Sequence, residues 1–413
     1  MPELSGPLTL TNGIALVGAD LRAVPFRRLI VVDDQITQID EMEDAAPDSV
    51  RAVDIVDLGG AYLLPGLIDA HVHFDLAAEP AAYTRWSDPR AVLTRSLTCL
   101  HNGLVALSRG ITGARDLGSV DGLVIDYAWA VERGRLVGPR IAAAGRPITI
   151  TGGHCADYGR TASGVDDVRE AVREQVALGA TVIKIMASGG ISTPGNPTKA
   201  QFTDPEMAAA VDEAHRLGLQ IAAHAHAPAA IRAAVEAGVD SIEHAGFADD
   251  ETVALMVEHG CTLVPTVTAL NNISEGVGIP ALTVAKSLAA RETYRANTRR
   301  AIQGGVRIAA GTDAGTALNP LGDLVDELDM YVERGLSEAA ALCAATVHAG
   351  RLIGQGVGVL EVGAKADLVV VATDPRAGLD TLRRPLQVVS HGRLVPLSWV
   401  AETIDRLAAA VAE

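Results

Sequence analysis

Residues that commonly bind metal ions stand at the ends of several apolar segments of the chain. The first of these segments ends in His71-Val72-His73, and a two-residue spacing in a β-strand directs both imidazoles to the same side. Two such nitrogens can hold one cation. A single HxH pair is also common by chance, and alone it could be two polar residues at a strand edge.

Four later segments carry residues of the same kind. Lys184 lies within the apolar run Thr-Val-Ile-Lys-Ile-Met, where burial of an ammonium group is costly, so the lysine should be paired with a carboxylate, neutralised or modified. The other segments end in His224-Ala225-His226, in Glu243-His244 and in Gly311-Thr312-Asp313-Ala314-Gly315. One such histidine alone would more often be an ordinary hydrogen-bonded residue. Metal-binding types at the ends of five segments favour a common site.

The elements that carry these residues follow the pattern of parallel βα units, in which short apolar runs alternate with Ala-rich helical stretches. A capping box formed by Thr203 and Glu206 predicts one helix start, and Gly218 predicts the end of that helix. Eight such units fit a (β/α)8 barrel; a doubly wound open sheet has the same periodicity, but the polar residues at the strand ends favour the barrel. The predicted strands lie near Leu67–His71, Gly113–Asp116, Ile141–Ala143, Val182–Ile185, Gln220–His224, Ser241–His244, Thr262–Val267 and Val306–Gly311.

The two ends of the chain have a different sequence pattern. Residues 1–65 are predicted to form short strands separated by turns. Residues 355–413 have the same pattern, for example at Ala366–Ala372 and Gln387–Ser390. We expect the two ends to build one small β domain, with a C-terminal helix, beside a barrel domain of residues 66–354.

Composition excludes several classes of function. The chain has 413 residues, a net charge of −17 and 48% hydrophobic residues, so it can bury a large core, while its acidic excess opposes binding to nucleic acid or to anionic membranes. No apolar run approaches the roughly 18 residues of a membrane span, and no basic signal-peptide start precedes Arg22. We therefore expect a soluble, cytoplasmic protein. Four small buried thiols without a CxxC pair are expected at Cys99, Cys155, Cys261 and Cys343.

As a set, these motifs resemble the amidohydrolase superfamily, metal-dependent hydrolases built on a (β/α)8 barrel. Ala61–His73 and Gly363–Val371 are similar to the family's segments that lead into and out of the barrel, which implies that the β domain is a β-sandwich. The family has HxH after the first strand, Lys on the fourth, His on the fifth and sixth and Asp on the eighth. The matching residues are His71, His73, Lys184, His224, His244 and Asp313.

The resemblance implies a site for two divalent metal ions. Lys184 would be carboxylated by carbon dioxide, and its carbamate would bridge both metals. His71, His73 and Asp313 would bind the more buried metal, and His224 and His244 the more exposed one. Zn²⁺ suits these imidazole and oxygen donors best, with manganese or cobalt as alternatives. A hydroxide between the metals would attack the substrate, and Asp313 would move the proton.

Four loop segments are similar to one branch of the family, the prolidase-like dipeptidases, N-acyl-amino-acid carboxypeptidases and ochratoxin-hydrolysing amidases. These segments are GITGARDLG, TGGHCADYG, KIMASGGISTPGNP and HAHAPAAI. They imply substrate contacts from Arg115, His154, Tyr158 and His226, although the branch often has tyrosine at the position of His226.

Alternatives remain at these positions. Arg115 precedes Asp116 and could form an ion pair with it, and His226 could replace His224 as a metal ligand. The segment Ile273–Arg300 could be a lid or a contact between subunits. Structural or solvent-facing roles are expected for His215, His259, His348 and His391.

The expected function is hydrolysis of the amide bond of a dipeptide or an N-acyl amino acid, as in a peptidase or carboxypeptidase. The presence of Lys184 argues against the deaminases of the superfamily, which usually work with one metal and lack this lysine. Esters, lactones, carbamates or phosphotriesters are alternative substrates of the same site. A non-catalytic binding barrel is a third possibility, which the complete ligand set argues against. Relatives are often multimeric, so a homo-oligomer is expected.

Overall fold

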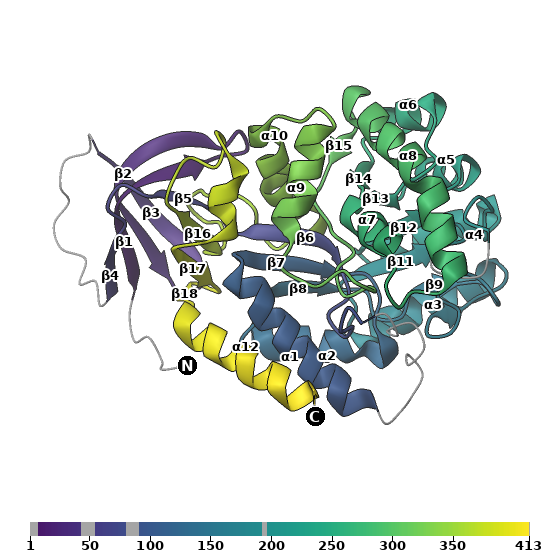
Figure 1. Ribbon diagram of the computed structural model, residues 1–413, viewed down its shortest axis with the longest axis horizontal. Helices are drawn as coiled ribbons and strands as arrows, with labels where there is room; N and C mark the ends of the chain where they lie inside the picture. Colours follow the sequence, from purple (N-terminus) through teal and green to yellow (C-terminus); the bar gives the residue numbers. More distant parts are fainter. Residues whose placement is uncertain (1–6, 43–53, 80–90, 192–195, 413) are drawn as a thin grey trace.

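The computed structural model describes residues 7–42, 54–79, 91–191 and 196–412. Figure 1 shows a mixed, mainly antiparallel sheet at one end of the molecule, which contains strands from both ends of the chain, and a larger α/β region that fills the rest.

The α/β region contains the eight predicted strands. The first three form a three-stranded parallel sheet, and the other five belong to a seven-stranded sheet with the short strands β9 (Ile148–Thr149) and β10 (Arg160–Thr161). The eight are β6 (Leu67–Val72), β7 (Ile111–Asp116), β8 (Arg140–Ala143), β11 (Val182–Met186), β12 (Gln220–Ala225), β13 (Ser241–His244), β14 (Thr262–Val264) and β15 (Arg307–Ile308). The seventh strand is shorter than predicted, because a helix already begins at Val267, and the eighth covers only Arg307–Ile308.

Backbone hydrogen bonds connect the two parallel sheets on both sides. The amide of Ala70 on β6 donates to the carbonyl of Ala310 at 2.8 Å, and the amide of Asp313 donates to the carbonyl of His71 at 2.7 Å. On the other side, the amide of Thr181 donates to the carbonyl of Ala143 at 3.0 Å. The carboxyl end of β6 therefore lies beside the segment that follows β15, which brings the first and last predicted ligands together.

Helices cover the outer faces of the parallel strands (Figure 1). The helix predicted after Thr203 is α4, and its capping box is present, with the Thr203 amide donating to Glu206 Oε2 at 2.9 Å. The helices are α1 (Val92–Ser108), α2 (Leu123–Glu132), α3 (Val165–Leu178), α4 (Asp204–Arg216), α5 (Pro228–Ala237), α6 (Asp250–Glu258), α7 (Val267–Glu275), α8 (Ala281–Gln303), α9 (Leu324–Glu333), α10 (Glu338–Cys343), α11 (Ala349–Ile353) and α12 (Leu397–Ala412).

Strands from both ends of the chain share one eight-stranded sheet, as the sequence predicted. The two ends meet where β5 pairs antiparallel with β16, with Leu64 opposite Val369. Leu10, Phe26 and Leu368 contribute to a separate hydrophobic core in this region. The strands of the sheet are β1 (Leu8–Val17), β2 (Arg22–Val32), β3 (Gln35–Glu41), β4 (Asp54–Asp57), β5 (Tyr62–Pro65), β16 (Leu368–Val371), β17 (Gln387–Ser390) and β18 (Arg393–Leu394).

Two expectations about composition can be compared with the structure. All four thiols are free, but only Cys99 and Cys261 are buried, while Cys155 and Cys343 are partly exposed, so the prediction of four buried thiols is wrong for two of them. Among the described residues, none of the helices combines the length and the apolarity that crossing a membrane requires.

Candidate metal centre

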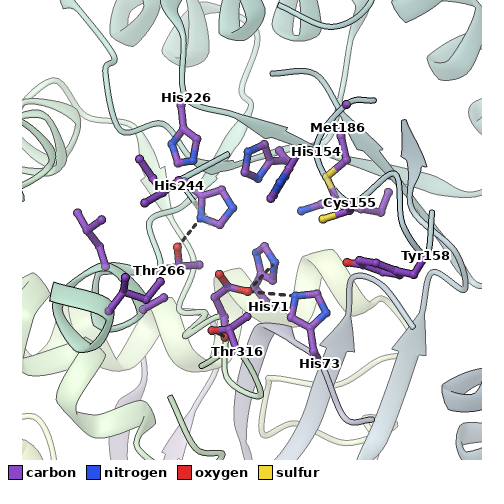
Figure 2. Close-up of a pocket in the computed structure, with 18 of the residues that line it drawn as sticks. His71, His73, His154, Cys155, Tyr158, Met186, His226, His244, Thr266 and Thr316 are labelled. Atoms are coloured by element: carbon purple, nitrogen blue, oxygen red, sulfur yellow. Dashed lines mark hydrogen bonds and ion pairs between the residues drawn. The ribbon is translucent and has the colours of Figure 1, made fainter. Parts of the chain in front are cut away.

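Most of the predicted site residues line one cavity of 460 Å³ at the carboxyl ends of the parallel strands (Figure 2). This placement follows from parallel strands, whose carboxyl ends and following loops share one side of the fold. The predicted residues on its wall are His71, His73, His154, Tyr158, Lys184, His224, His226, His244 and Asp313. Arg115 is absent from this wall.

His71, His73 and Asp313 form a compact cluster whose candidate ligand atoms all lie within 4.8 Å of one another. His73 donates from Nδ1 to the carbonyl of Gly118 at 2.9 Å, so its other nitrogen, Nε2, faces Asp313 Oδ1 at 3.0 Å. A bare imidazole nitrogen and a carboxylate oxygen repel each other at this distance unless a cation lies between them, either a proton or a metal ion. The donor set therefore fits a divalent cation.

Glu243 fixes the orientation of His71. Its carboxylate accepts a hydrogen bond from His71 Nδ1 at 2.8 Å, which leaves Nε2 of the ring directed toward Asp313. Arg115 donates from Nη2 to the same carboxylate at 2.8 Å, and both side chains are fully buried. Burial alone would raise the pKa of Glu243, but Arg115 and His71 outweigh burial and lower this pKa to about 2. The carboxylate therefore stays ionised and accepts the His71 proton.

These contacts correct the prediction for Arg115. Its guanidinium donates to the Ala70 carbonyl, the Ser241 hydroxyl and Glu243, and it has no exposed surface. The arrangement favours the ion-pair alternative over a substrate contact. The partner is Glu243 rather than Asp116, because consecutive residues of β7 point to opposite faces of the strand.

Lys184 lies on β11, on the same face as Met186, and its side chain reaches the cavity. It is 2% exposed, and Nζ has no hydrogen-bond partner in the described part of the chain. Burial lowers the pKa of this amine to about 8. An unpartnered amine beside His71 and Asp313 fits conversion to a carbamate, which would replace a desolvated cation by an anionic ligand.

His224, His226 and His244 also line the cavity, and the ring centroid of His244 lies 5.1 Å from that of His71. His224 donates from Nε2 to the carbonyl of Gly189 at 3.2 Å, which leaves Nδ1 free for a cation, and its ring centroid lies 4.6 Å from that of His244. His226 contacts Tyr294 instead, with its Nδ1 3.3 Å from the tyrosine hydroxyl. His224 and His226 therefore each have one ring nitrogen engaged by a hydrogen-bond partner, and both rings lie beside that of His244.

Left-handed backbone conformations determine the direction of two side chains of the site. His244 has φ of +74° and Asp313 has φ of +59°. In a regular strand Glu243 and His244 would point to opposite faces, but the left-handed turn at His244 lets Glu243 reach His71 while His244 reaches the cavity. Such strained residues persist at functional sites where the surroundings hold them.

Comparison with known proteins identifies the family of the chain. The profile of the amidohydrolase family matches residues 62–395. The chain belongs to the amidohydrolase family. Ochratoxinase from Aspergillus niger is 34% identical over 363 residues, which cover 80% of this chain and 74% of the relative.

Solved structures of similar amidohydrolases include a Xaa-Pro dipeptidase with methionine bound in its active site. It is 30% identical with a TM-score of 0.84, over 94% of this chain and 99% of that chain. A prolidase complexed with N-methylphosphonate-L-proline is 31% identical with a TM-score of 0.85, also over 94% of this chain and 99% of that chain.

In this amidohydrolase, His154 and Tyr158 line the same cavity as the predicted metal-ligating side chains. The His154 ring centroid lies 4.3 Å from that of His224, and Tyr158 directs its hydroxyl end into the cavity (Figure 2). Gly190 permits this placement, because a Cβ atom there would lie 2.3 Å from Cε1 of His154. The histidines predicted to be structural lie elsewhere; His215 contacts Asp240 and His348 contacts the Ile308 carbonyl.

Several residues in or behind the wall of the amidohydrolase cavity were not predicted as site residues. Glu243, which lies behind His71, could have been found from the sequence, because an acidic residue directly precedes a strand-end histidine. No feature of the sequence indicated Thr266, since it contacts His244 only in the folded chain. The segment Ile273–Arg300 lies in α7 and α8, where Ile273 and Tyr294 form part of the cavity wall. Other apolar residues of the wall are Met186, Ile191, Ala269 and Leu270.

Proposed function

We propose that this amidohydrolase is a binuclear metal enzyme that cleaves the amide bond of a dipeptide or an N-acyl amino acid. The observation that carries the proposal is the cluster of His71, His73 and Asp313 beside the unpartnered amine of Lys184. The relatives named Xaa-Pro dipeptidase, prolidase and ochratoxinase support an amide or peptide substrate. In the same proposal, the eight parallel strands close into a (β/α)8 barrel, which the hydrogen bonds between the two parallel sheets support.

The ligand roles follow from the free nitrogens of the site. His71, His73 and Asp313 would hold one cation, His224 and His244 the other, and carboxylated Lys184 would contribute to both. Two divalent ions, with Zn²⁺ the best match to imidazole and oxygen donors, would supply polarisation of the scissile carbonyl and activation of water.

The chain's own residues would then handle the proton and the substrate. Asp313 would accept a proton from the attacking water and deliver it to the nitrogen of the leaving amine as the C–N bond breaks. His154, Tyr158 and His226 have hydrogen-bonding groups on the cavity wall and would bind the substrate's carboxylate or acyl oxygen. The apolar side of the cavity, formed by residues such as Leu270 and Ile273, would take its side chains.

Amine release from a panel of dipeptides and N-acyl amino acids tests this function. The zinc-loaded protein, prepared in bicarbonate buffer, should release amine, and Asp313→Asn should lower kcat by roughly 10²–10⁴-fold, as expected for loss of a general acid–base. Asp405→Asn, on the exposed side of α12, is the matched control and should behave like the unchanged protein.

Two outcomes would contradict the proposal. Full activity of Asp313→Asn would exclude its role in proton transfer. No amine release from any amide, together with hydrolysis of lactones, carbamates, carboxylic esters or phosphotriesters, would assign the site to that alternative class of substrate.

A further inference from the structure

The N-terminal end of α7 lies directly behind His244. Thr266 precedes the first residue of α7, and its hydroxyl lies 2.6 Å from His244 Nδ1 (Figure 2). Its backbone is left-handed, with φ of +50° and ψ of +49°. This conformation is unusual for a β-branched residue, so the surroundings must hold it.

Thr266 does not cap its own helix. Threonine at this position normally accepts a hydrogen bond from an amide in the first turn, but its side chain makes no such bond here. The hydroxyl contacts His244 instead, and the first amides of α7 need another acceptor.

Glu327 of α9 provides that acceptor from a distant part of the chain. Its carboxylate is fully buried and accepts hydrogen bonds from the amides of Val267 and Thr268, both at 2.7 Å. It also accepts one from the Thr268 hydroxyl at 2.8 Å. A carboxylate at a helix N-terminus is favoured both by these amides and by the helix dipole.

We propose that Glu327 is a positioning residue for His244 and that it acts through Thr266. By occupying the amides of Val267 and Thr268, Glu327 removes partners that would otherwise compete for the Thr266 hydroxyl. The hydroxyl stays with His244 Nδ1, and the ring keeps Nε2 directed into the cavity. This inference rests on the proposed role of His244 as a ligand of the more exposed metal.

Titration of the metal-free protein with Co²⁺ tests the inference without an activity assay. Glu327→Gln keeps the size of the side chain but replaces one acceptor oxygen by a donor that faces an amide. The first Co²⁺ should bind as in the unchanged protein, and the second at least ~10-fold more weakly, as is typical when a contact that orients a ligand is lost. The visible spectrum of the second Co²⁺ should change with it.

Asp329→Asn is the matched control, because Asp329 lies on the same helix and pairs with Arg383 on the surface. The Asp329→Asn protein should bind the second Co²⁺ with the same affinity as the unchanged protein. Equal second-site affinity in a folded Glu327→Gln protein would overturn the positioning role and leave the proposed function standing. Failure of the unchanged protein to bind a second Co²⁺ would overturn both.

A pair of substitutions at Thr266 carries the test if Glu327→Gln does not fold. Thr266→Ser keeps the hydroxyl and should retain the second Co²⁺ affinity, whereas Thr266→Val removes the hydroxyl and should lose it. Equal affinity in these two variants would overturn the proposal.

Discussion

Each predicted metal-ligating histidine has one ring nitrogen in contact with a group outside the predicted ligand set. In His71 and His73 the other nitrogen faces Asp313. The engaged nitrogens contact Glu243, the Gly118 carbonyl, the Gly189 carbonyl and Thr266. Such contacts fix the ring orientation before a cation arrives, which reduces the cost of assembling the site. Lys184 Nζ has no hydrogen-bond partner in the described residues. Burial of the unmodified amine should therefore lower the free energy of unfolding.

Lys184→Met should stabilise the metal-free protein while it abolishes activity. The substitution removes a buried, unpartnered ammonium and keeps a side chain of similar length, so the free energy of unfolding should rise by roughly 1–3 kcal/mol. Urea unfolding of the metal-free protein measures the change, and Lys199→Met, at an exposed lysine, should leave it unaltered. A fall in stability would show that the fold provides a partner for the amine.

At the scale of elements, charged contacts fix α3 against α4 on the outside of the parallel strands. Glu213 of α4 accepts a hydrogen bond from Arg173 of α3 at 2.8 Å and another from Arg216 on its own helix. The side chain of Glu213 is 1% exposed although both arginines are about half exposed. Its hydrogen bonds to Arg216 and Arg173 lower the pKa of Glu213 from 4.5 to about 2.

Glu213 should therefore make stability depend on pH in acid. Because its pKa is lower in the folded state, its contribution is complete above pH 4.5 and is lost as the pH falls toward 2. Glu213→Gln should cost roughly 1–2 kcal/mol at neutral pH, after allowance for solvent screening of the arginines. The stability difference between the two proteins should narrow from pH 5 to pH 3 in unfolding experiments, whereas Glu236→Gln, at an exposed site on α5, should show no difference at any pH. A constant difference for Glu213→Gln would contradict the assigned pKa.

At the scale of the whole molecule, a buried ionic cluster joins the eight-stranded mixed sheet to the strands of the two parallel sheets. Arg140 of β8 is 1% exposed and donates to Asp367 at 2.5 Å and to Asp34 at 3.1 Å. Asp367 directly precedes β16, and Asp34 lies between β2 and β3. One side chain of the parallel strands thus contacts segments from both ends of the chain.

Arg140→Met should destabilise the protein strongly, because it leaves Asp367 buried without its counter-charge. Removing one partner of a buried pair typically costs about 3–5 kcal/mol. Arg232→Met is the control, since Arg232 pairs with Glu251 at the surface and should cost no more than about 1 kcal/mol. Thermal unfolding of the metal-free proteins measures the stability of both variants. Equal losses of stability in Arg140→Met and Arg232→Met would show that the cluster does not hold the two regions together.

The sequence by itself predicted the order of the eight parallel strands, the sheet shared by both ends and nine of the residues that line the cavity. These features depend on local periodicity and on residue types at strand ends, which sequence displays directly. Only the tertiary structure decided which side chains contact one another. Arg115 pairs with Glu243, His244 contacts Thr266, and Glu327 accepts hydrogen bonds from the first amides of α7. Each of these contacts joins separate elements, and the left-handed backbone at His244 and Thr266 breaks the alternation from which side-chain direction is predicted.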